Sequence, residues 1–178
     1  NIIVVLDQAY CEYVDENDYD KNFSLVSEFE NIILTRTFSK AYGLAGIRLG
    51  WCYSSLRVSS IIAKVKGPFN INTFAQNLAL IALDDFDHLE KVVSETKKIK
   101  NWFEKELKKL NIKVNPSFAN FSFIESKEET ILLIYSALEE NGIIVRQLYS
   151  YGLPSCLRIS IGTFDNMKKV ISVLKKIL

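Results

Sequence analysis

Short apolar runs alternate with stretches of helical periodicity along the first half of the chain. Residues 2–6 are five consecutive apolar residues, a pattern typical of a strand buried on both faces in a parallel sheet. Residues 32–34 and 49–53 indicate two further strands, and residues 54–66 have helical spacing. Residues 73–83 are apolar nearly all round a helix, so we expect that helix to be buried.

A long amphipathic pattern from residue 87 to residue 110 predicts a helix that separates two parts of different character. The part after it predicts a smaller α+β unit, with strands at 112–114, 120–124, 143–145 and 157–161 and helices at 128–140 and after Thr163. We therefore predict the α/β class with two domains, residues 1–86 and 87–178.

The composition is that of an ordinary globular protein. Of 178 residues, 48% are hydrophobic and 24% charged, and the net charge is +1, which gives no electrostatic reason to expect a nucleic acid or an anionic membrane as partner. No apolar run approaches the roughly 20 residues that cross a bilayer, and no signal-peptide pattern opens the chain. Three scattered cysteines and one histidine lack the spacing of a metal site, so we expect no metal and a reducing cytoplasm.

The candidate chemistry is concentrated in the segment 35–51. Lys40 follows a buried strand and hydroxyl residues, and a lysine whose charge is disfavoured by its neighbours or by burial can attack a carbonyl carbon. Thr37, Ser39 and Arg48 supply donors suited to a phosphate group. A phosphate-bearing aldehyde that bonds to a lysine amine is pyridoxal phosphate (PLP), which is therefore the first candidate cofactor.

PLP needs a carboxylate that keeps its ring nitrogen protonated. Asp7 ends the first apolar run, and ligands of open α/β sheets bind at the carboxyl ends of strands. Tyr10 follows three residues later and is suited to hydrogen-bond the phenolic oxygen of the ring. Asp7, Tyr10, Lys40 and Arg48 thus form one coherent set of candidate residues.

Three segments carry a resemblance to a known family: Leu6–Tyr10, Arg36–Gly50 and Leu157–Thr163. They resemble the fold-type I PLP-dependent aminotransferases, and within these the histidinol-phosphate aminotransferases, over essentially the whole chain. The resemblance implies a fold-type I PLP-transferase: part of a large PLP-binding domain with a mostly parallel sheet in residues 1–86, and a small C-terminal α+β domain in residues 87–178.

The resemblance also assigns roles to the candidate residues. It makes Lys40 the catalytic residue that holds the cofactor and moves protons. The residues that it implies bind PLP are Asp7, Tyr10, Thr37, Ser39, Lys40 and Arg48.

Two arginines in the second half, Arg146 and Arg158, are candidates for substrate binding. Each flanks or lies within an apolar strand, and arginine is seldom buried without an anionic partner. A structural carboxylate such as Glu125 or Glu139 is one alternative. The resemblance implies the other, in which Arg146 helps to hold a substrate phosphate and Arg158 the substrate carboxylate or the corresponding polar end.

The implied reaction is reversible transamination of histidinol phosphate with 2-oxoglutarate, which gives imidazole-acetol phosphate and glutamate in histidine biosynthesis. The partners that we expect are a small-molecule amino donor, a 2-oxo acid and a second copy of the chain in a homodimer. An aromatic aminotransferase, a threonine-phosphate decarboxylase of the same family and a non-catalytic truncated fragment remain alternatives.

The start of the chain bears on the last alternative. Asn1 opens the sequence inside what is predicted as a core strand, so we expect something upstream of it to be missing. The resemblance implies that an aromatic residue, an asparagine and a phosphate-binding helix start lie upstream. We therefore expect these 178 residues alone to bind PLP weakly at best and to turn over no substrate.

Overall fold

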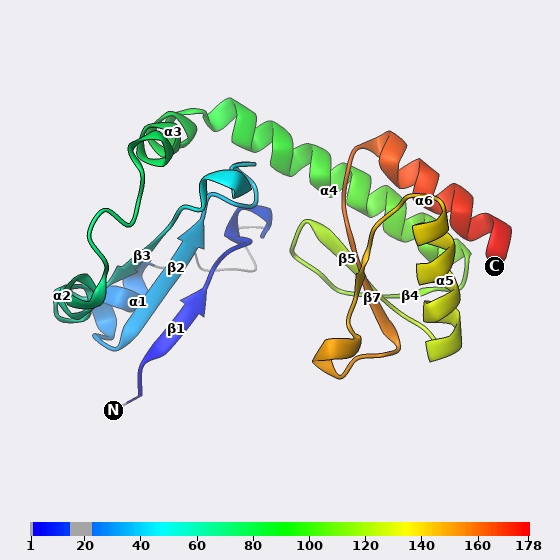
Figure 1. Ribbon diagram of the computed structural model, residues 1–178, viewed down its shortest axis with the longest axis horizontal. Coiled ribbons are helices and arrows are strands. Elements are labelled where there is room, and N and C mark those ends of the chain that lie inside the picture. Colours follow the sequence, from blue (N-terminus) through cyan, green and yellow to red (C-terminus); the bar gives the residue numbers. More distant parts are fainter. Residues whose placement is uncertain (1, 15–22) are drawn as a thin grey trace. The chain divides into compact units, whose positions relative to one another are not determined.

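The computed structural model describes residues 2–14 and 23–178, and the chain forms two compact units, Asn1–Val93 and Ser94–Leu178 (Figure 1). The division falls within α4 (Phe86–Lys109). Each unit has a sheet of its own, so the two are described in turn.

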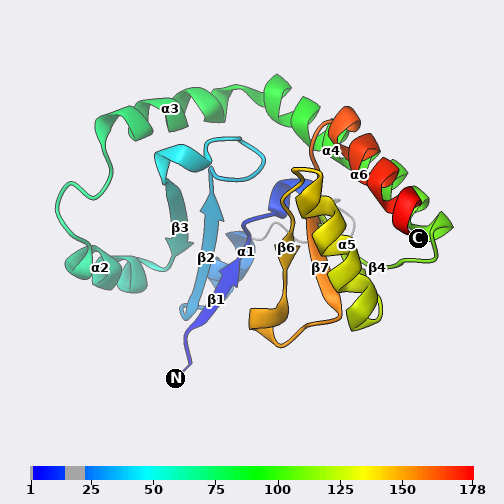
Figure 2. The ribbon, with the colours of Figure 1, turned by 45° about the vertical axis from the view of Figure 1, so that its right-hand side comes forward.

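The first unit contains a three-stranded sheet in the order β1-β2-β3, with bounds Val4–Asp7, Ile32–Thr37 and Gly50–Ser54 (Figure 2). β1 pairs with β2 in parallel, and β2 pairs with β3 in the antiparallel sense. The helices of this unit are α1 (Phe23–Glu28), α2 (Leu56–Val65) and α3 (Thr73–Asp84), with short 3-10 turns at Cys11–Tyr13 and Ala45–Ile47. The predicted α/β class is confirmed, and one of the two strand pairings is parallel.

The prediction that the first strand is buried on both faces is wrong for the described residues. Val5 is 56% exposed, whereas Leu34 on β2 is completely buried. β2 is the central strand and packs against Val26 of α1 through Ile32 and Leu34, whereas β1 lies at the edge of the sheet. An apolar run therefore indicates that a strand is able to be buried. Whether the strand is buried depends on its position in the sheet.

The prediction that residues 73–83 form a buried helix is half right. The helix is present as α3, and Asn72 Oδ1 caps it by accepting from Ala75 N at 2.8 Å. Only Ala75 and Ala79 are buried, while Phe74 is 69% exposed and Ile81 65% exposed. Among the described residues, only the side of this helix that carries Ala75 and Ala79 is covered.

The second unit contains a four-stranded antiparallel sheet in the order β4-β5-β7-β6. The strands are Lys113–Asn115, Phe121–Glu125, Cys156–Ser160 and Arg146–Gln147 in that spatial order. The other elements are α5 (Glu128–Glu140), a 3-10 turn at Tyr149–Tyr151 and α6 (Phe164–Ile177).

The strand predicted at 143–145 lies in fact at Arg146–Gln147. The backbone N–H of Ile143 donates to Leu138 O at 2.8 Å, and Gly142 has a φ of 72°. This left-handed glycine closes the end of α5. Because the N–H of Ile143 is bonded to the helix, it cannot pair with a neighbouring strand. Strand pairing therefore begins only at Arg146.

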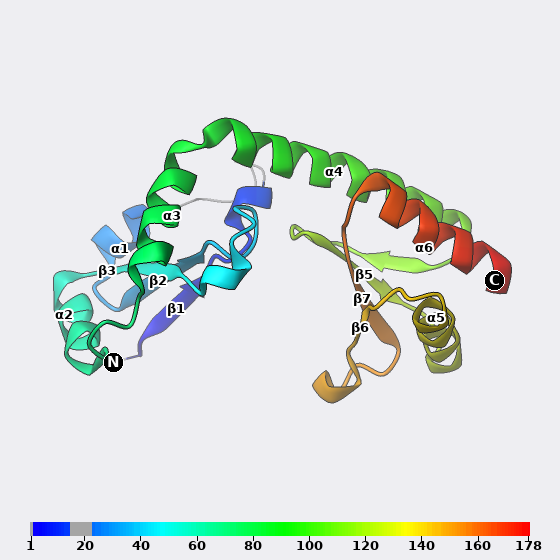
Figure 3. The ribbon, with the colours of Figure 1, turned by 45° about the horizontal axis from the view of Figure 1, so that its top comes forward.

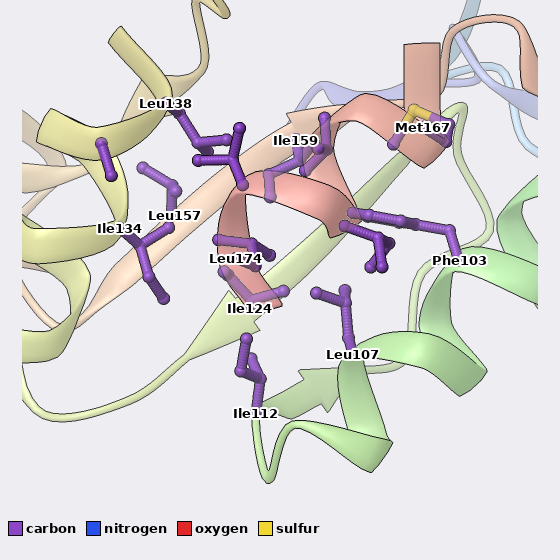
Figure 4. Close-up of a cluster of buried hydrophobic side chains, with 14 of the residues drawn as sticks. Phe103, Leu107, Ile112, Ile124, Ile134, Leu138, Leu157, Ile159, Met167 and Leu174 are labelled. Atoms are coloured by element: carbon purple, nitrogen blue, oxygen red, sulfur yellow. The ribbon is translucent and has the colours of Figure 1, made fainter. Parts of the chain in front are cut away.

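The core of the second unit lies on one face of its sheet (Figure 4). Ile124 on β5 and Leu157 on β7 are directly paired on adjacent strands, so their side chains lie on the same face of the sheet. Both belong to a buried cluster with side chains from α4, α5 and α6. α6 runs alongside α4 (Figure 3), and Lys175 Nζ lies 3.2 Å from Glu106 Oε2 between them. In the described ranges, no helix is both long and apolar enough to cross a membrane.

Candidate active site

Lys40 lies in a turn that leaves the end of β2. The turn is anchored at its base, where the buried Phe38 donates its N–H to Leu49 O at 3.1 Å. Within the turn, Gly43 N donates to Lys40 O at 2.9 Å, and Gly43 has a φ of 71°. Only glycine adopts that conformation without strain, so Gly43 sets the path of the backbone that carries the lysine.

The amine of Lys40 lies over the ring of Tyr10, with Nζ 5.0 Å from the ring centroid. No carboxylate of residues 2–14 or 23–178 lies within 4.0 Å of this amine. The side chain is half-buried. An unpaired lysine amine beside an aromatic ring can reach a carbonyl group without first breaking an ion pair.

Asp7 stands at the carboxyl end of β1, where it pairs in register with Thr35 of β2. Its Oδ1 accepts from Ala9 N at 3.1 Å and from Thr35 Oγ1 at 3.4 Å. Its other oxygen, Oδ2, accepts no hydrogen bond from any other described residue. The carboxylate is therefore held on one side and open on the other.

Thr37, Ser39 and Arg48, the candidate phosphate ligands, lie on the same stretch of chain as Lys40. Thr37 Oγ1 accepts from Ser39 N at 3.0 Å, which bends the chain just before the lysine. Arg48 has a φ of 54° and a ψ of 49°, a left-handed conformation that is strained for a residue with a side chain. Its Nη1 donates to Ala45 O at 2.9 Å. Backbone strain of this kind is concentrated at functional sites. Here the backbone conformation sets the direction in which the Arg48 side chain leaves the chain.

Tyr42 packs beside the same turn, with its ring 5.1 Å from that of Phe38. Burial raises the pKa of the Tyr42 hydroxyl, and the nearby carboxylate of Glu12 and thiol of Cys11 raise it further. The hydroxyl therefore stays protonated across the physiological range. Tyr42 adds a neutral donor to this end of the sheet.

Arg146 and Arg158 come together in the second unit. They are opposite each other in the antiparallel pair of β6 and β7, so both side chains stand on one face of the sheet. The guanidinium of Arg158 lies 5.2 Å from the Phe121 ring and that of Arg146 lies 5.8 Å from the Tyr151 ring. Arg158 Nε is buried, and no described residue accepts a hydrogen bond from it.

The carboxylates considered as structural partners for these arginines are engaged elsewhere. Glu125 Oε2 lies 2.8 Å from Lys113 Nζ, and Glu139 Oε1 accepts from Tyr135 Oη at 2.9 Å. A buried guanidinium N–H without an acceptor is costly. The pair of arginines therefore has the chemistry of an anion-binding site.

Sequence patterns assigned no role to Gln8 and Arg36, which the structure joins next to Asp7 and the Lys40 turn. The available signal was an arginine within a short strand of otherwise apolar and hydroxyl residues. Such a residue needs a partner, but the sequence does not name it.

Residues 1–174 match the family described as aminotransferase class I and II. The chain belongs to this aminotransferase family. The match runs through both units, so the Lys40 turn and the arginine pair lie in parts of the chain that the family shares.

Relatives with assigned names are similar over the whole chain. The chain is 40% identical to histidinol-phosphate aminotransferase 1 of Psychrobacter arcticus, with 100% of this chain and 47% of the relative aligned. It is 37% identical to a histidinol-phosphate aminotransferase of Rhodopseudomonas palustris, with 98% of this chain and 48% of the relative aligned. The chain thus spans about half the length of these relatives.

Solved aminotransferase structures have the same fold. Histidinol-phosphate aminotransferase of Sinorhizobium meliloti, solved in complex with pyridoxal-5'-phosphate, superposes with a TM-score of 0.87 at 26% identity over 99% of this chain and 50% of that one. Aspartate aminotransferase of Thermotoga maritima superposes with a TM-score of 0.82 at 23% identity over 99% of this chain and 48% of that one. The fold-type I architecture expected from the sequence is confirmed.

Proposed function

We propose that this chain is part of a PLP-dependent aminotransferase that converts histidinol phosphate and 2-oxoglutarate to imidazole-acetol phosphate and glutamate in histidine biosynthesis. The observation that carries the proposal is the Lys40 amine, which has no ion pair among the described residues and lies 5.0 Å from the Tyr10 ring centroid. The names of relatives at 37–40% identity support the choice of substrate.

The residues of the first unit fit PLP group by group. Its aldehyde matches the unpaired amine of Lys40, and its ring nitrogen matches Asp7, whose Oδ2 is open. Tyr10 is suited to the phenolic oxygen of the ring. The residues proposed to hold the phosphate are hydroxyl and guanidinium donors of the Lys40 turn, namely Thr37, Ser39 and Arg48. In this proposal residues 1–86 belong to the large PLP-binding domain and residues 87–178 form the small one.

When bound, PLP supplies an electron sink that stabilises negative charge at the substrate Cα. Lys40 would hold the cofactor through its side-chain amine, and the same amine, once free, would move a proton at the substrate Cα. Asp7 keeps the proton on the ring nitrogen. Arg48 and the two hydroxyls hold the phosphate still, which fixes the geometry of the proton transfer.

Arg146 and Arg158 hold the anionic ends of the substrates in this proposal. Arg146 binds the phosphate of the amino donor, and Arg158 binds the carboxylate of 2-oxoglutarate and the corresponding polar end of the donor. The buried and unpartnered Nε of Arg158 supports this role, since an arriving carboxylate would satisfy it.

The proposal extends to a homodimer in the cytoplasm. The uncovered apolar side of α3, with Phe74 and Ile81, supports a second copy of the chain as the partner that covers it. Cys52 and Cys156 are free thiols, which supports a reducing compartment.

The test is to locate the cofactor on the intact protein. Borohydride reduction in the presence of PLP should attach the cofactor to the peptide that contains Lys40. Lys40→Ala should lose the label and all transamination while remaining folded, and Lys64→Ala, on an exposed part of α2, should retain both. Label on another lysine with Lys40 unmodified would contradict the proposal.

A further inference from the structure

Gln8 and Arg36 form a hydrogen-bonded bridge between the ends of β1 and β2. Arg36 Nε and Nη2 both donate to Gln8 Oε1, at 3.2 Å and 3.0 Å. Gln8 is only 5% exposed. A buried amide oxygen that lost these donors would remain unsatisfied, so the bridge is a strong constraint on both side chains.

Two aromatic rings fix the guanidinium of Arg36. Its Cζ atom lies 5.2 Å from the Phe23 ring centroid and 5.4 Å from that of Trp51. The two rings are nearly parallel, with an interplanar angle of 5°. In the described part of the chain no carboxylate lies within 4.0 Å of Arg36, so its orientation is set by the rings and by Gln8.

The bridge lies directly beside the candidate cofactor residues. Gln8 follows Asp7, and its N–H donates to Thr35 O at 2.9 Å, which extends the parallel pairing by one residue. Arg36 precedes Thr37, where the Lys40 turn begins. One side-chain contact therefore connects the backbone that carries the carboxylate with the backbone that carries the amine.

We propose that Arg36 is a positioning residue that acts through Gln8. It holds the end of β1, with Asp7, at a fixed offset from the Lys40 turn, so that both groups meet one cofactor. In the described sheet β1 is an edge strand that pairs only with β2, and the Arg36–Gln8 contact joins the two strands at the end that carries Asp7. The inference rests on the proposed function for its cofactor but on the observed contacts for its geometry.

The bridge can be altered without touching a residue proposed to contact PLP. In the intact protein, Gln8→Leu removes the acceptor, Gln8→Glu keeps one, and Arg36→Lys keeps the charge but loses the planar two-donor fork. We expect Gln8→Leu and Arg36→Lys each to weaken PLP binding by about tenfold, the equivalent of one net interaction. Gln8→Glu should bind PLP close to wild type.

The matched control is Asn31→Ala. Asn31 Nδ2 donates to Ile2 O at 2.8 Å and so bridges the same two strands at their opposite ends. Its loss should lower the stability of the sheet and leave PLP affinity unchanged. Amide hydrogen exchange without PLP gives a second readout: Gln8 and Phe38 should exchange faster in Arg36→Lys than in Asn31→Ala.

The results separate this inference from the proposed function. Wild-type PLP affinity in Gln8→Leu and Arg36→Lys, or an equal loss in Asn31→Ala, would overturn it. If the wild type itself binds no PLP, the proposed function is wrong, and the amide hydrogen-exchange rates alone test the positioning role of Arg36. Faster exchange at Gln8 and Phe38 in Arg36→Lys alone then supports the positioning role, and equal rates in the two variants refute it.

Discussion

Arg146 on β6 lies directly opposite Arg158 on β7, so two guanidinium groups share one face of the second sheet. Like charges in directly opposed positions repel each other and destabilise a strand pair. Each arginine is instead packed against an aromatic ring, Tyr151 for one and Phe121 for the other. Binding an anion between them would relieve the repulsion, which makes the pair a testable binding site.

Arg146→Ala should discriminate between substrates. If Arg146 holds a phosphate, the variant loses about 1.5–3 kcal/mol of binding free energy for phosphorylated donors, the scale for hydrogen bonds to a charged group. Unphosphorylated donors should bind as they do to the wild type. Dissociation constants for both kinds of donor in the intact protein measure the difference, and an equal loss for both would assign Arg146 to structure.

Arg158→Ala should weaken the amino donor and 2-oxoglutarate alike, because both must dock in the same site in turn. The loss should again be about 1.5–3 kcal/mol for each. Steady-state kinetics with each substrate varied separately measures it, with Arg146→Ala as the comparison. Unchanged Michaelis constants for both substrates would end this assignment.

If the proposed homodimer forms through the apolar side of α3, Ile81→Glu should shift the protein from dimer toward monomer. Ile81 is 65% exposed on the apolar side of α3, and a buried carboxylate without a partner would oppose association at that surface. Sedimentation velocity over a concentration series measures the shift. Gln76→Glu adds the same charge to the same helix at an exposed polar position and serves as the control. A wild-type association constant in Ile81→Glu would exclude this surface from the interface.

Gly50→Ala should destabilise the protein by about 1–3 kcal/mol, the usual cost of forcing an atom into a packed site. A Cβ at Gly50 would lie 2.7 Å from the carbonyl oxygen of Arg36, which is backbone and cannot move away alone. Gly46→Ala is the matched control, since a Cβ there meets no atom within 4 Å. The comparison is made by urea unfolding of both variants. Equal midpoints would show that the backbone of β2 moves to accommodate the added Cβ at little cost.

Glu106→Gln should remove part of the acid sensitivity of the fold. Hydrogen bonds from Lys109 and Lys175 hold the pKa of Glu106 below its ordinary value of 4.5. Below that value the unfolded chain takes up a proton more readily than the folded one, so the stabilisation present at neutral pH is lost as the pH falls. The wild type's advantage in free energy of unfolding over Glu106→Gln should therefore shrink as the pH falls from neutral to below 4.5. A constant difference across that range would contradict the assignment.

Local patterns were sufficient for most of the elements, although not for the strand at Arg146–Gln147, and for the chemistry of single residues. Helix α5 begins and ends where its periodicity predicts, at Glu128 and Glu140, because helical spacing and caps are encoded within a few residues. The strands that flank the Lys40 turn were predicted for the same reason. The turn itself was recognisable because its residues are contiguous in the sequence.

The sequence by itself thus determined which segments form helices and strands, which family the chain resembles, and which residues carry reactive groups. Only the tertiary structure decided that Arg146 faces Arg158, that Gln8 bridges to Arg36, and that α3 has an uncovered side. The first two depend on which strands become neighbours and in what register, and the third depends on which side of the helix other segments cover. The local sequence pattern indicates whether a residue faces an apolar or a polar environment. Its partner on a neighbouring strand is set by chain segments many residues away.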